Sequence, residues 1–124
     1  MSMVLREELS EGIVAITLNR PESLNALSPA LFSELNQIVT ELSKQTDSVG
    51  CVILRGAGRC FSAGNDLKAV RSGVKAKEKF FQAKTIDLIE KLPQPTIASV
   101  HGHCLTGALE LAIACDLMIT SESA

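Results

Sequence analysis

The feature that most constrains the fold is a pattern that the chain uses twice. A short apolar strand is followed by a turn of small residues and then by the start of a helix. The first copy is CVIL at 51–54 followed by RGAGRCFSAGND, and the second is TIASV at 96–100 followed by HGHCLTGALE. Alternating strands and helices favour a parallel α/β arrangement over a sandwich of antiparallel sheets. The sequence therefore predicts an α/β fold in which both of these strands are buried on both faces.

The remaining elements follow from apolar spacing and from turn residues. The β-branched run at 13–18 predicts a strand, and the segment before it can pair with this strand as a hairpin across 10–12. Ser28 and Pro29 mark the beginning of a helix that reaches about residue 44. We further expect a helical turn at 66–70, helices at 76–91 and 108–115, and a buried last strand at 116–120. The side chains expected to be buried from the two long helices are Leu31, Leu35, Ile38, Val39, Leu42, Phe81, Leu88 and Ile89.

Composition excludes several classes of partner. A formal net charge of −2 and the absence of Trp and Tyr give no basis for binding nucleic acid or an anionic membrane. No apolar run approaches the ~20 residues that span a bilayer, and the acidic first segment is unlike a signal peptide. The cysteines are scattered without a CxxC pair, which predicts reduced, mostly buried thiols and no metal site. These cysteines are Cys51, Cys60, Cys104 and Cys115. We therefore expect a cytoplasmic protein, or a mitochondrial matrix protein if a transit peptide has been removed.

The two glycine-bearing turns carry the first chemical hypothesis. The first N–H groups of any helix lack partners and carry partial positive charge. Small residues let a ligand oxygen approach these groups, and two such donors aimed at one point make an oxyanion hole. The alternative is that both turns merely connect strands to helices, which is the commoner role for a single turn of this kind.

Glu110 carries the second hypothesis, because it is the only charged residue between His103 and Asp116. A carboxylate on an otherwise apolar helix is costly unless it is paired, solvated or functional. Partial burial would raise its pKa and the helix N-terminus would lower it, so the group suits general acid–base chemistry. The alternative is a solvent-facing glutamate, and the residues alone leave the two open.

Three segments in a fixed order resemble a known family. They are VAITLNRPESLNALS at 14–28, VILRGAGRCFSAGNDLK at 52–68 and PTIASVHGHCLTGALELAIACDLMIT at 95–120. The sequence resembles the crotonase superfamily, which contains the enoyl-CoA hydratases and isomerases. The resemblance implies a right-handed spiral of repeated strand–strand–helix turns. It also implies that residues 1–124 correspond to the N-terminal part of such a domain, truncated before the C-terminal helical region.

The resemblance also implies roles for individual residues. The N–H groups of Asn65 and Gly107 would hold the oxygen of an acyl-CoA thioester, and Glu110 would be the first of two hydratase glutamates. The second glutamate lies further along the family pattern than Ala124. Asp66 would cap its turn, and Lys68 would either reach the CoA phosphates or be an ordinary solvated lysine. The other substrate contacts implied are Ser23, Leu24, Ala26, Ala63, Gly64 and Ala108, with Leu109 and residues 69–80 shaping the acyl pocket.

Two smaller features accompany the resemblance. Thr106 stands where many members have glycine, so its hydroxyl could crowd the acyl pocket or donate a hydrogen bond. His101 and His103 flank Gly102 and are expected to stabilise the turn or line a pocket, because two histidines without a third ligand are weak support for zinc.

The resemblance therefore implies an enoyl-CoA hydratase or isomerase, and Glu110 favours hydration. No separate cofactor is expected, because coenzyme A is part of the substrate, and the full-length family implies a homo-oligomer, a trimer or hexamer. The alternative is a non-catalytic module that binds acyl-CoA or a protein partner, which the missing second acid supports. A nucleotide-binding protein is disfavoured because neither GxGxxG nor GxxxxGK[ST] occurs.

Overall fold

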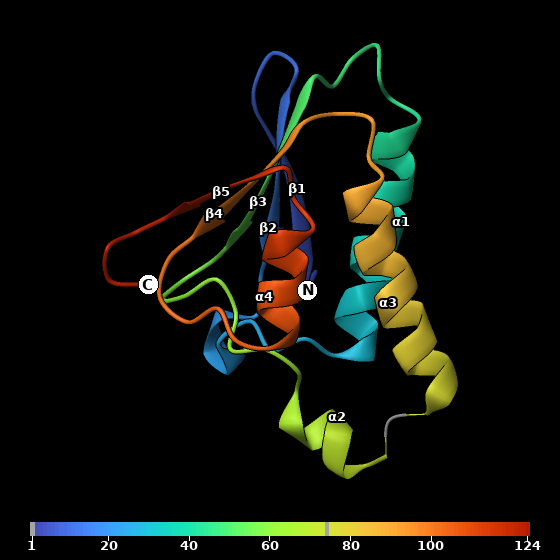
Figure 1. The fold of residues 1–124 in the computed structure, drawn as a ribbon, viewed down its shortest axis with the longest axis vertical. Coiled ribbons are helices and arrows are strands. Elements are labelled where there is room, and N and C mark those ends of the chain that lie inside the picture. Colours follow the sequence, from blue (N-terminus) through green and yellow to red (C-terminus); the bar gives the residue numbers. More distant parts are fainter. Residues whose placement is uncertain (1, 74) are drawn as a thin grey trace.

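The computed structural model describes residues 2–73 and 75–124, which form one five-stranded sheet with helices packed against it (Figure 1). The strands lie in chain order across the sheet, β1 and β2 are antiparallel, and every later pair is parallel. The α/β prediction and the predicted hairpin are therefore confirmed. The strands are β1 (Val4–Ser10), β2 (Ile13–Leu18), β3 (Cys51–Gly56), β4 (Thr96–Val100) and β5 (Leu117–Thr120).

The helices α1, α3 and α4 lie on one face of the sheet, and α2 lies apart from them beyond the ends of the strands (Figure 1). A short 3-10 helix, η1, precedes α1. Each predicted helix is present with ends within two residues of the expected ones. The helices are η1 (Pro21–Ser23), α1 (Pro29–Ser43), α2 (Leu67–Arg71), α3 (Ala76–Glu90) and α4 (Gly107–Ile113).

Helix α1 begins where the sequence predicts. The Ser28 hydroxyl accepts a hydrogen bond from the Leu31 N–H at 3.2 Å, and Pro29 occupies the first helical position. The apolar residues of α1 recur every three or four positions and pack onto the sheet, and each fully buried leucine contributes about 1.5–3 kcal/mol. The prediction missed Phe32, which is also buried. Of the predicted core residues Leu31, Leu35, Val39, Leu42 and Ile89 are buried, while Ile38, Phe81 and Leu88 are half-buried against the core.

The opposite face of the sheet is more open than the sequence predicts. Ile53 and Ile97 are half-buried and Ser99 is exposed, so the prediction that β3 and β4 are buried on both faces is wrong. A parallel sheet is buried on both faces only when helices cover both, and here the described helices pack on one. The predicted burial of the last strand is also wrong, since Leu117 and Ile119 are each 63% exposed. The reason is that β5 lies at the edge of the sheet.

A second, shorter ladder lies beyond the carboxyl ends of the parallel strands. Leu27 forms a parallel bridge with Asn65, and Ser62 forms one with Cys104. The chain therefore repeats a unit three times: a strand of the large sheet, a short bridging segment, and a helical segment. This repeat is the spiral of strand–strand–helix turns that the resemblance implies, and it places the two glycine-bearing turns next to one another.

Candidate active site

The second ladder presents the N–H group of Asn65 on its open side. The bridge uses the Leu27 N–H, which donates to the Gly64 carbonyl at 2.8 Å, and the Leu27 carbonyl, which accepts from the Asp66 N–H at 2.9 Å. In a parallel bridge of this kind the N–H and C=O of the central residue point the other way. Gly107 is the first residue of α4, so its N–H lacks an intrahelical acceptor. Among the hydrogen bonds recorded for residues 2–73 and 75–124, none uses either of these two N–H groups.

Gly107 and Asn65 are in direct contact. A Cβ atom added at Gly107 would lie 2.7 Å from the Asn65 Oδ1 atom and 3.3 Å from both the Gln82 Nε2 atom and the Leu27 Cδ1 atom. The first of these distances is shorter than any normal carbon–oxygen contact, so a side chain at this position would displace Asn65. The glycine is therefore needed for the close approach of the two turns. The structure brings together the two residues that sequence analysis singled out as paired donors.

Asn25 fixes the loop that supports Asn65, and sequence analysis assigned it no role. Its side chain is fully buried, and its Nδ2 atom donates to the carbonyls of Ala57 at 2.8 Å, Cys60 at 3.0 Å and Phe61 at 3.1 Å. Its Oδ1 atom accepts from the Arg20 N–H at 2.7 Å. The backbone φ angle of Asn25 is +54°, in the left-handed region that asparagine tolerates better than most residues. The signal in the sequence was an asparagine between two polar turns.

Asp66 caps α2, as predicted. Its Oδ1 atom accepts from the Lys68 N–H at 2.9 Å, and its Oδ2 atom lies 3.2 Å from the Arg20 guanidinium. Burial alone would raise the pKa of the Asp66 carboxyl, but the Lys68 N–H, the Arg20 guanidinium and the Ala69 N–H together lower that pKa below its ordinary value. Asp66 therefore holds the SAGND loop as an ionised carboxylate that links η1 to α2.

Glu110 lies in the first turn of α4 with its side chain exposed to solvent. Leu109 is 42% exposed and Ile113 is 65% exposed on the same helix, while Leu111 and Ala112 are buried. The structure therefore agrees with the alternative in which Glu110 faces solvent. The surface around the carboxylate is nevertheless apolar, since Leu109 and Ile113 are its exposed neighbours on α4.

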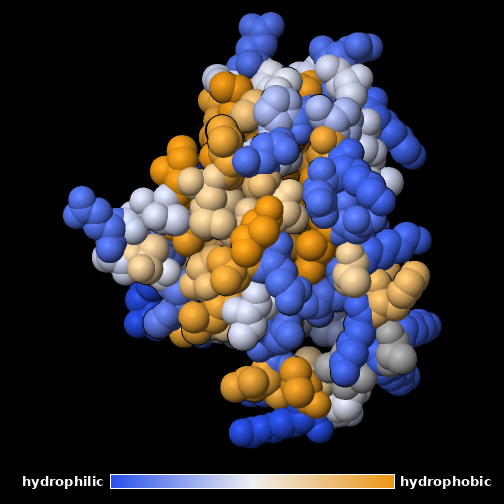
Figure 2. Space-filling model, in the orientation of Figure 1, coloured by the Kyte–Doolittle hydropathy of each residue, from blue (hydrophilic) through white to orange (hydrophobic). Residues whose placement is uncertain are grey.

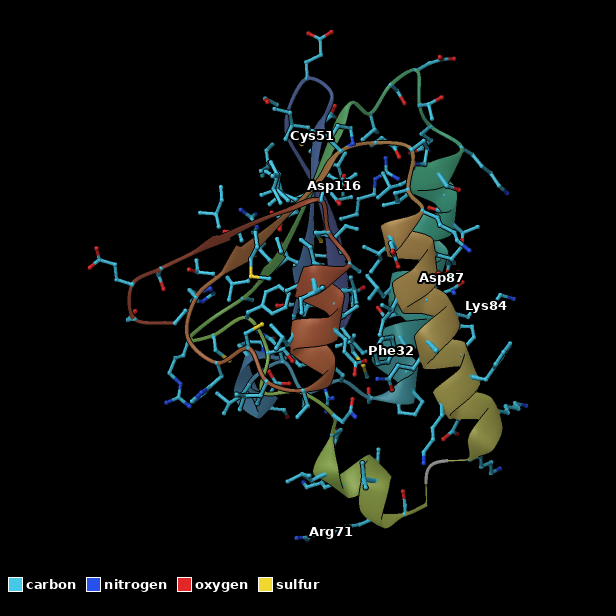
Figure 3. The ribbon with its side chains drawn as sticks, in the orientation of Figure 1. Phe32, Cys51, Arg71, Lys84, Asp87 and Asp116 are labelled. Carbon is cyan, nitrogen blue, oxygen red and sulfur yellow. The ribbon has the colours of Figure 1, made fainter. Side chains whose placement is uncertain are left out.

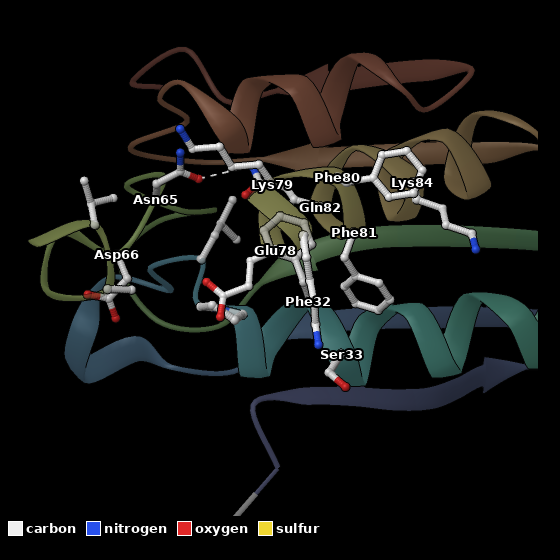
Figure 4. A pocket seen from close by; sticks show the side chains of 15 residues that line it. Phe32, Ser33, Asn65, Asp66, Glu78, Lys79, Phe80, Phe81, Gln82 and Lys84 are labelled. Carbon is white, nitrogen blue, oxygen red and sulfur yellow. Dashed lines mark hydrogen bonds between the residues drawn. The ribbon is translucent and has the colours of Figure 1, made fainter. Parts of the chain in front are cut away.

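A cavity of about 760 Å³ opens beside Asn65, between α1, α2 and α3 (Figure 4). Its apolar wall includes Leu27, Phe32, Val70 and Phe81, and Lys77, Lys79 and Lys84 supply positive charge. Of residues 69–80, Ala69, Val70 and 77–80 line this cavity. That they shape an acyl pocket stays a prediction. Val74 of that range lies outside the described residues.

A second cavity of about 700 Å³ lies between α4, β5 and the loop that contains Leu24. Its lining includes Arg59, His103, Leu109 and Met118. Figure 2 shows hydrophobic residues gathered over α4 and the neighbouring strands on this side of the molecule. The exposed large apolar residues on this side form the α4/β5 face and are Leu105, Leu109, Ile113 and Met118. Leu117 and Ile119 pair with Ile97 and Ser99 and lie on the opposite face of the sheet.

The other residues predicted to contact substrate lie at different depths. Ser23 and Lys68 are exposed, whereas Ala108 is fully buried in the core and lines neither large cavity. The Leu24 carbonyl accepts from the Ala63 N–H at 2.9 Å, and the Ala26 carbonyl accepts from the Arg20 guanidinium at 2.7 Å. As contacts to a substrate, all of these residues stay predictions. The half-buried members of the set are Leu24, Ala26 and Ala63, and Gly64 is buried.

The turn around Gly102 is held by a histidine. The His101 Nε2 atom lies 2.8 Å from the Gly58 carbonyl, which confirms a turn-stabilising role, and His103 lines the second cavity. Thr106 has a backbone φ of +46°. A Cβ atom added to Gly64 would lie 2.5 Å from the Thr106 hydroxyl oxygen. Thr106 therefore crowds the backbone of the SAGND loop, and it does not line the cavity beside Asn65.

The cysteines are free thiols. Cys60 and Cys115 are buried, whereas Cys51 and Cys104 are half-buried. None of the four is paired, as predicted, but the prediction that the thiols are mostly buried is correct for only two of them. Burial raises the pKa of the Cys115 thiol to about 11. No three His, Cys, Asp or Glu side chains of the described chain cluster closely enough to hold a metal ion. In the same residues no helix is both long and apolar enough to cross a membrane.

Comparisons with known proteins agree with this arrangement. An enoyl-CoA isomerase/hydratase of Mycosarcoma maydis is 39% identical over 122 residues, which are 90% of this chain and 44% of that protein. The crystal structure of an enoyl-CoA hydratase from Bacillus anthracis superposes with a TM-score of 0.91 at 38% identity, covering 98% of this chain and 48% of the other. An enoyl-CoA hydratase/isomerase from Xanthobacter autotrophicus Py2 gives a TM-score of 0.89 at 40% identity, covering 99% and 47%.

This chain therefore spans about half the length of the relatives that it matches. The family model described as enoyl-CoA hydratase/isomerase matches residues 8–124. That range covers both glycine-bearing turns, the caps of α1 and α2, and all of α4. The chain belongs to the enoyl-CoA hydratase/isomerase family.

Proposed function

We propose that this chain binds acyl-CoA thioesters and provides the oxyanion-binding groups and one acid–base residue of an enoyl-CoA hydratase or isomerase. The observation that carries the proposal is the pair of unbonded N–H groups, Asn65 and Gly107, on two turns in direct contact. Asn65 also lines a cavity with an apolar wall that is large enough for an acyl chain. The similarity to enoyl-CoA hydratases and isomerases is the second observation that supports the proposal.

The chemistry follows from the charge that develops on the thioester oxygen. When water adds across the double bond, its oxygen bonds to the β-carbon and a proton is delivered to the α-carbon. In between, the thioester becomes an enolate, whose negative oxygen the N–H groups of Asn65 and Gly107 would stabilise. Glu110 would accept the proton from water or return it to carbon. Coenzyme A would enter as part of the substrate, without a separate cofactor.

The binding of the coenzyme A portion is assigned to the loop Ser23–Leu27 and to nearby cations. The backbone groups of Leu24 and Ala26 already tie this loop to the SAGND loop and to Arg20. Lys68 is exposed at the beginning of α2, next to the SAGND loop, and its side chain would contact a phosphate of coenzyme A bound there. Three lysines, Lys77, Lys79 and Lys84, line the cavity against two carboxylates, Asp66 and Glu78, and this small excess of positive charge favours an anionic ligand at its rim.

The test compares a thioester with an analogue that has no carbonyl oxygen. Butyryl-CoA should bind this chain about tenfold more tightly than S-butyl-CoA, because only the thioester offers an oxygen to two N–H donors. Gly107→Ala should abolish this difference, since its Cβ would push Asn65 aside. Gly50→Ala is the matched control, because a Cβ atom there meets nothing closer than 3.8 Å. Equal binding of thioester and thioether by the wild-type chain would refute the proposal.

A non-catalytic acyl-CoA-binding module is the second candidate. It is favoured by the exposure of Glu110, because a fully solvated carboxylate is a weak acid–base catalyst. Incubation with a short trans-2-enoyl-CoA and detection of the hydrated product by mass spectrometry distinguishes the two. If the chain is an enzyme, Glu110→Gln loses turnover and keeps thioester binding. If it is a binding module, neither protein gives product and both bind.

We further propose a homo-oligomer in the cytoplasm. The free thiols suit a reducing compartment. The α4/β5 face exposes four large apolar residues, and an exposed apolar surface of this kind marks an interaction site. Sedimentation velocity over a concentration series measures the assembly directly.

A further inference from the structure

A thin partition separates the paired N–H groups from the large cavity. The three atoms nearest to an added Cβ on Gly107 are Asn65 Oδ1, Gln82 Nε2 and Leu27 Cδ1. Each of these three residues also lines the cavity of about 760 Å³, whereas Gly107 is absent from its described lining. The side chains of Leu27, Asn65 and Gln82 therefore stand between α4 and the cavity.

The partition is closed by one hydrogen bond. The Gln82 Nε2 atom donates to the Asn65 Oδ1 atom at 3.3 Å, and this bond joins the second turn of α3 to the SAGND loop (Figure 4). A length of 3.3 Å is beyond the usual range for an N–H···O bond, and the bond lies at the surface, since Asn65 is exposed and Gln82 is half-buried. The bond is therefore weak and can open without breaking the packing of either element.

The surroundings show what lies on each side. Toward α4 are the Gly107 N–H and the Asn65 N–H, both without partners among the described residues. Toward α1 and α3 the cavity is lined by the aromatic ring of Phe32 (Figures 3 and 4) and by that of Phe81 (Figure 4). A thioester held by the two N–H groups must pass the Asn65–Gln82 pair before its acyl chain reaches the apolar wall.

We propose that the Asn65–Gln82 hydrogen bond is a latch that sets the acyl chain length this protein accepts. Short acyl groups fit on the α4 side with the latch closed. Longer acyl chains enter the cavity only after the bond between the two amides has opened, so part of their apolar binding free energy is spent on opening it. This inference rests on the proposed function, and it makes Gln82 a specificity-determining residue that sequence analysis did not identify.

The experiment measures the dissociation constants of butyryl-CoA and decanoyl-CoA by isothermal titration calorimetry on the full chain. The readout is the ratio of the two constants, which reports chain-length preference independently of turnover. Gln82→Ala should shift the ratio toward decanoyl-CoA by about three- to tenfold, the equivalent of one net hydrogen bond. Gln82→Met retains the bulk without the hydrogen bond and should shift it in the same direction. Gln37→Ala, an exposed glutamine on α1, is the matched control and should leave the ratio unchanged.

The possible results separate the latch from a purely steric role of Gln82 and from failure of the proposed function. A shift in both Gln82 variants and none in Gln37→Ala supports the latch. A shift in Gln82→Ala alone would overturn it, because bulk and not the hydrogen bond would then close the partition. An unchanged ratio in both variants, with butyryl-CoA still bound, would overturn the latch and leave the proposed function standing. If the wild-type chain binds neither thioester, both the proposed function and the latch are wrong. Circular dichroism of each variant confirms that it is folded.

Discussion

Replacing Asn25 with alanine should destabilise the fold more than the loss of any other single polar side chain in the described residues. Asn25 is fully buried, and its amide group joins the loop at 20–27 to the loop at 57–62. Its two Nδ2 hydrogens are shared among three backbone carbonyls at 2.8–3.1 Å, and its Oδ1 atom satisfies the Arg20 N–H. The variant would leave at least two carbonyls and one N–H group without partners.

The magnitude follows from these orphaned groups. A buried donor or acceptor without a partner costs about 1–3 kcal/mol, and water entering the space left by the side chain recovers part of this cost. The left-handed φ of +54° adds about 1 kcal/mol for alanine. We therefore expect Asn25→Ala to lower the free energy of unfolding by about 4–6 kcal/mol. A domain of this size has about 6–19 kcal/mol in total, so the variant should remain marginally folded.

Urea unfolding followed by circular dichroism measures the change. Asn36→Ala is the matched control, because Asn36 is half-buried on α1 and donates one hydrogen bond, to the Thr85 hydroxyl at 3.0 Å. That variant should lose about 1 kcal/mol. Asn25→Ala should also weaken thioester binding, because the lost side-chain bonds position the backbone carbonyl of residue 25, which accepts from the Ser62 hydroxyl, and that hydroxyl accepts from the Gly64 N–H beside Asn65. A loss no larger than that of Asn36→Ala would refute the reasoning.

Three further predictions concern other parts of the site. The pKa of the Asp66 carboxyl is lower in the folded state than in the unfolded state, so its stabilisation is present above the unfolded pKa and is lost as pH falls through the folded pKa. In Asp66→Asn, the free energy of unfolding measured with urea should therefore fall less steeply as the pH is lowered. Gly64→Ala should destabilise the chain by more than about 1 kcal/mol in the same assay, because its φ is +97° and its Cβ would lie 2.5 Å from the Thr106 hydroxyl. Iodoacetamide at pH 8 should modify half-buried Cys51 well before buried Cys115, whose pKa is raised to about 11, and peptide mass spectrometry would show the order.

Local signals explain which elements could be predicted from the sequence. Ser28 and Pro29 specify the beginning of α1 through a hydroxyl acceptor and a fixed φ, and neither depends on the rest of the fold. The β-branched run of β2 is bounded by Gly12 and Asn19, and the strand ends where those residues predict. Asp66 capping α2 was predictable for the same reason, since the capping oxygen lies two residues from the N–H that it accepts.

The errors came from properties that only the packed chain has. An apolar strand such as β5 looks the same in sequence whether a neighbour covers it or not, so its exposure could not be predicted. The Asn65–Gln82 bond joins residues 17 apart, across a segment of unremarkable composition, and no local pattern identifies it. The role of Asn25 could not be predicted, because its buried carbonyl partners lie more than 30 residues away.

The α4/β5 face leads to a last prediction, which concerns self-association. Ile113 is 65% exposed and Met118 is 40% exposed, on a helix and an edge strand that contact each other. Burying one isoleucine contributes about 1.5–3 kcal/mol, so a contact between two copies through this face gains from several such residues at once.

We therefore expect sedimentation velocity to show concentration-dependent self-association of the wild-type chain. Ile113→Lys combined with Met118→Lys should weaken the association by at least about tenfold, because two ammonium groups would have to be desolvated. Leu67→Lys is the matched control, since Leu67 is 71% exposed but lies on α2, away from this face. If the control weakens the association as much as the double variant, the α4/β5 face is not the contact. If the wild-type chain stays monomeric at its highest soluble concentration, its apolar residues at α4 and β5 are too dispersed to drive association.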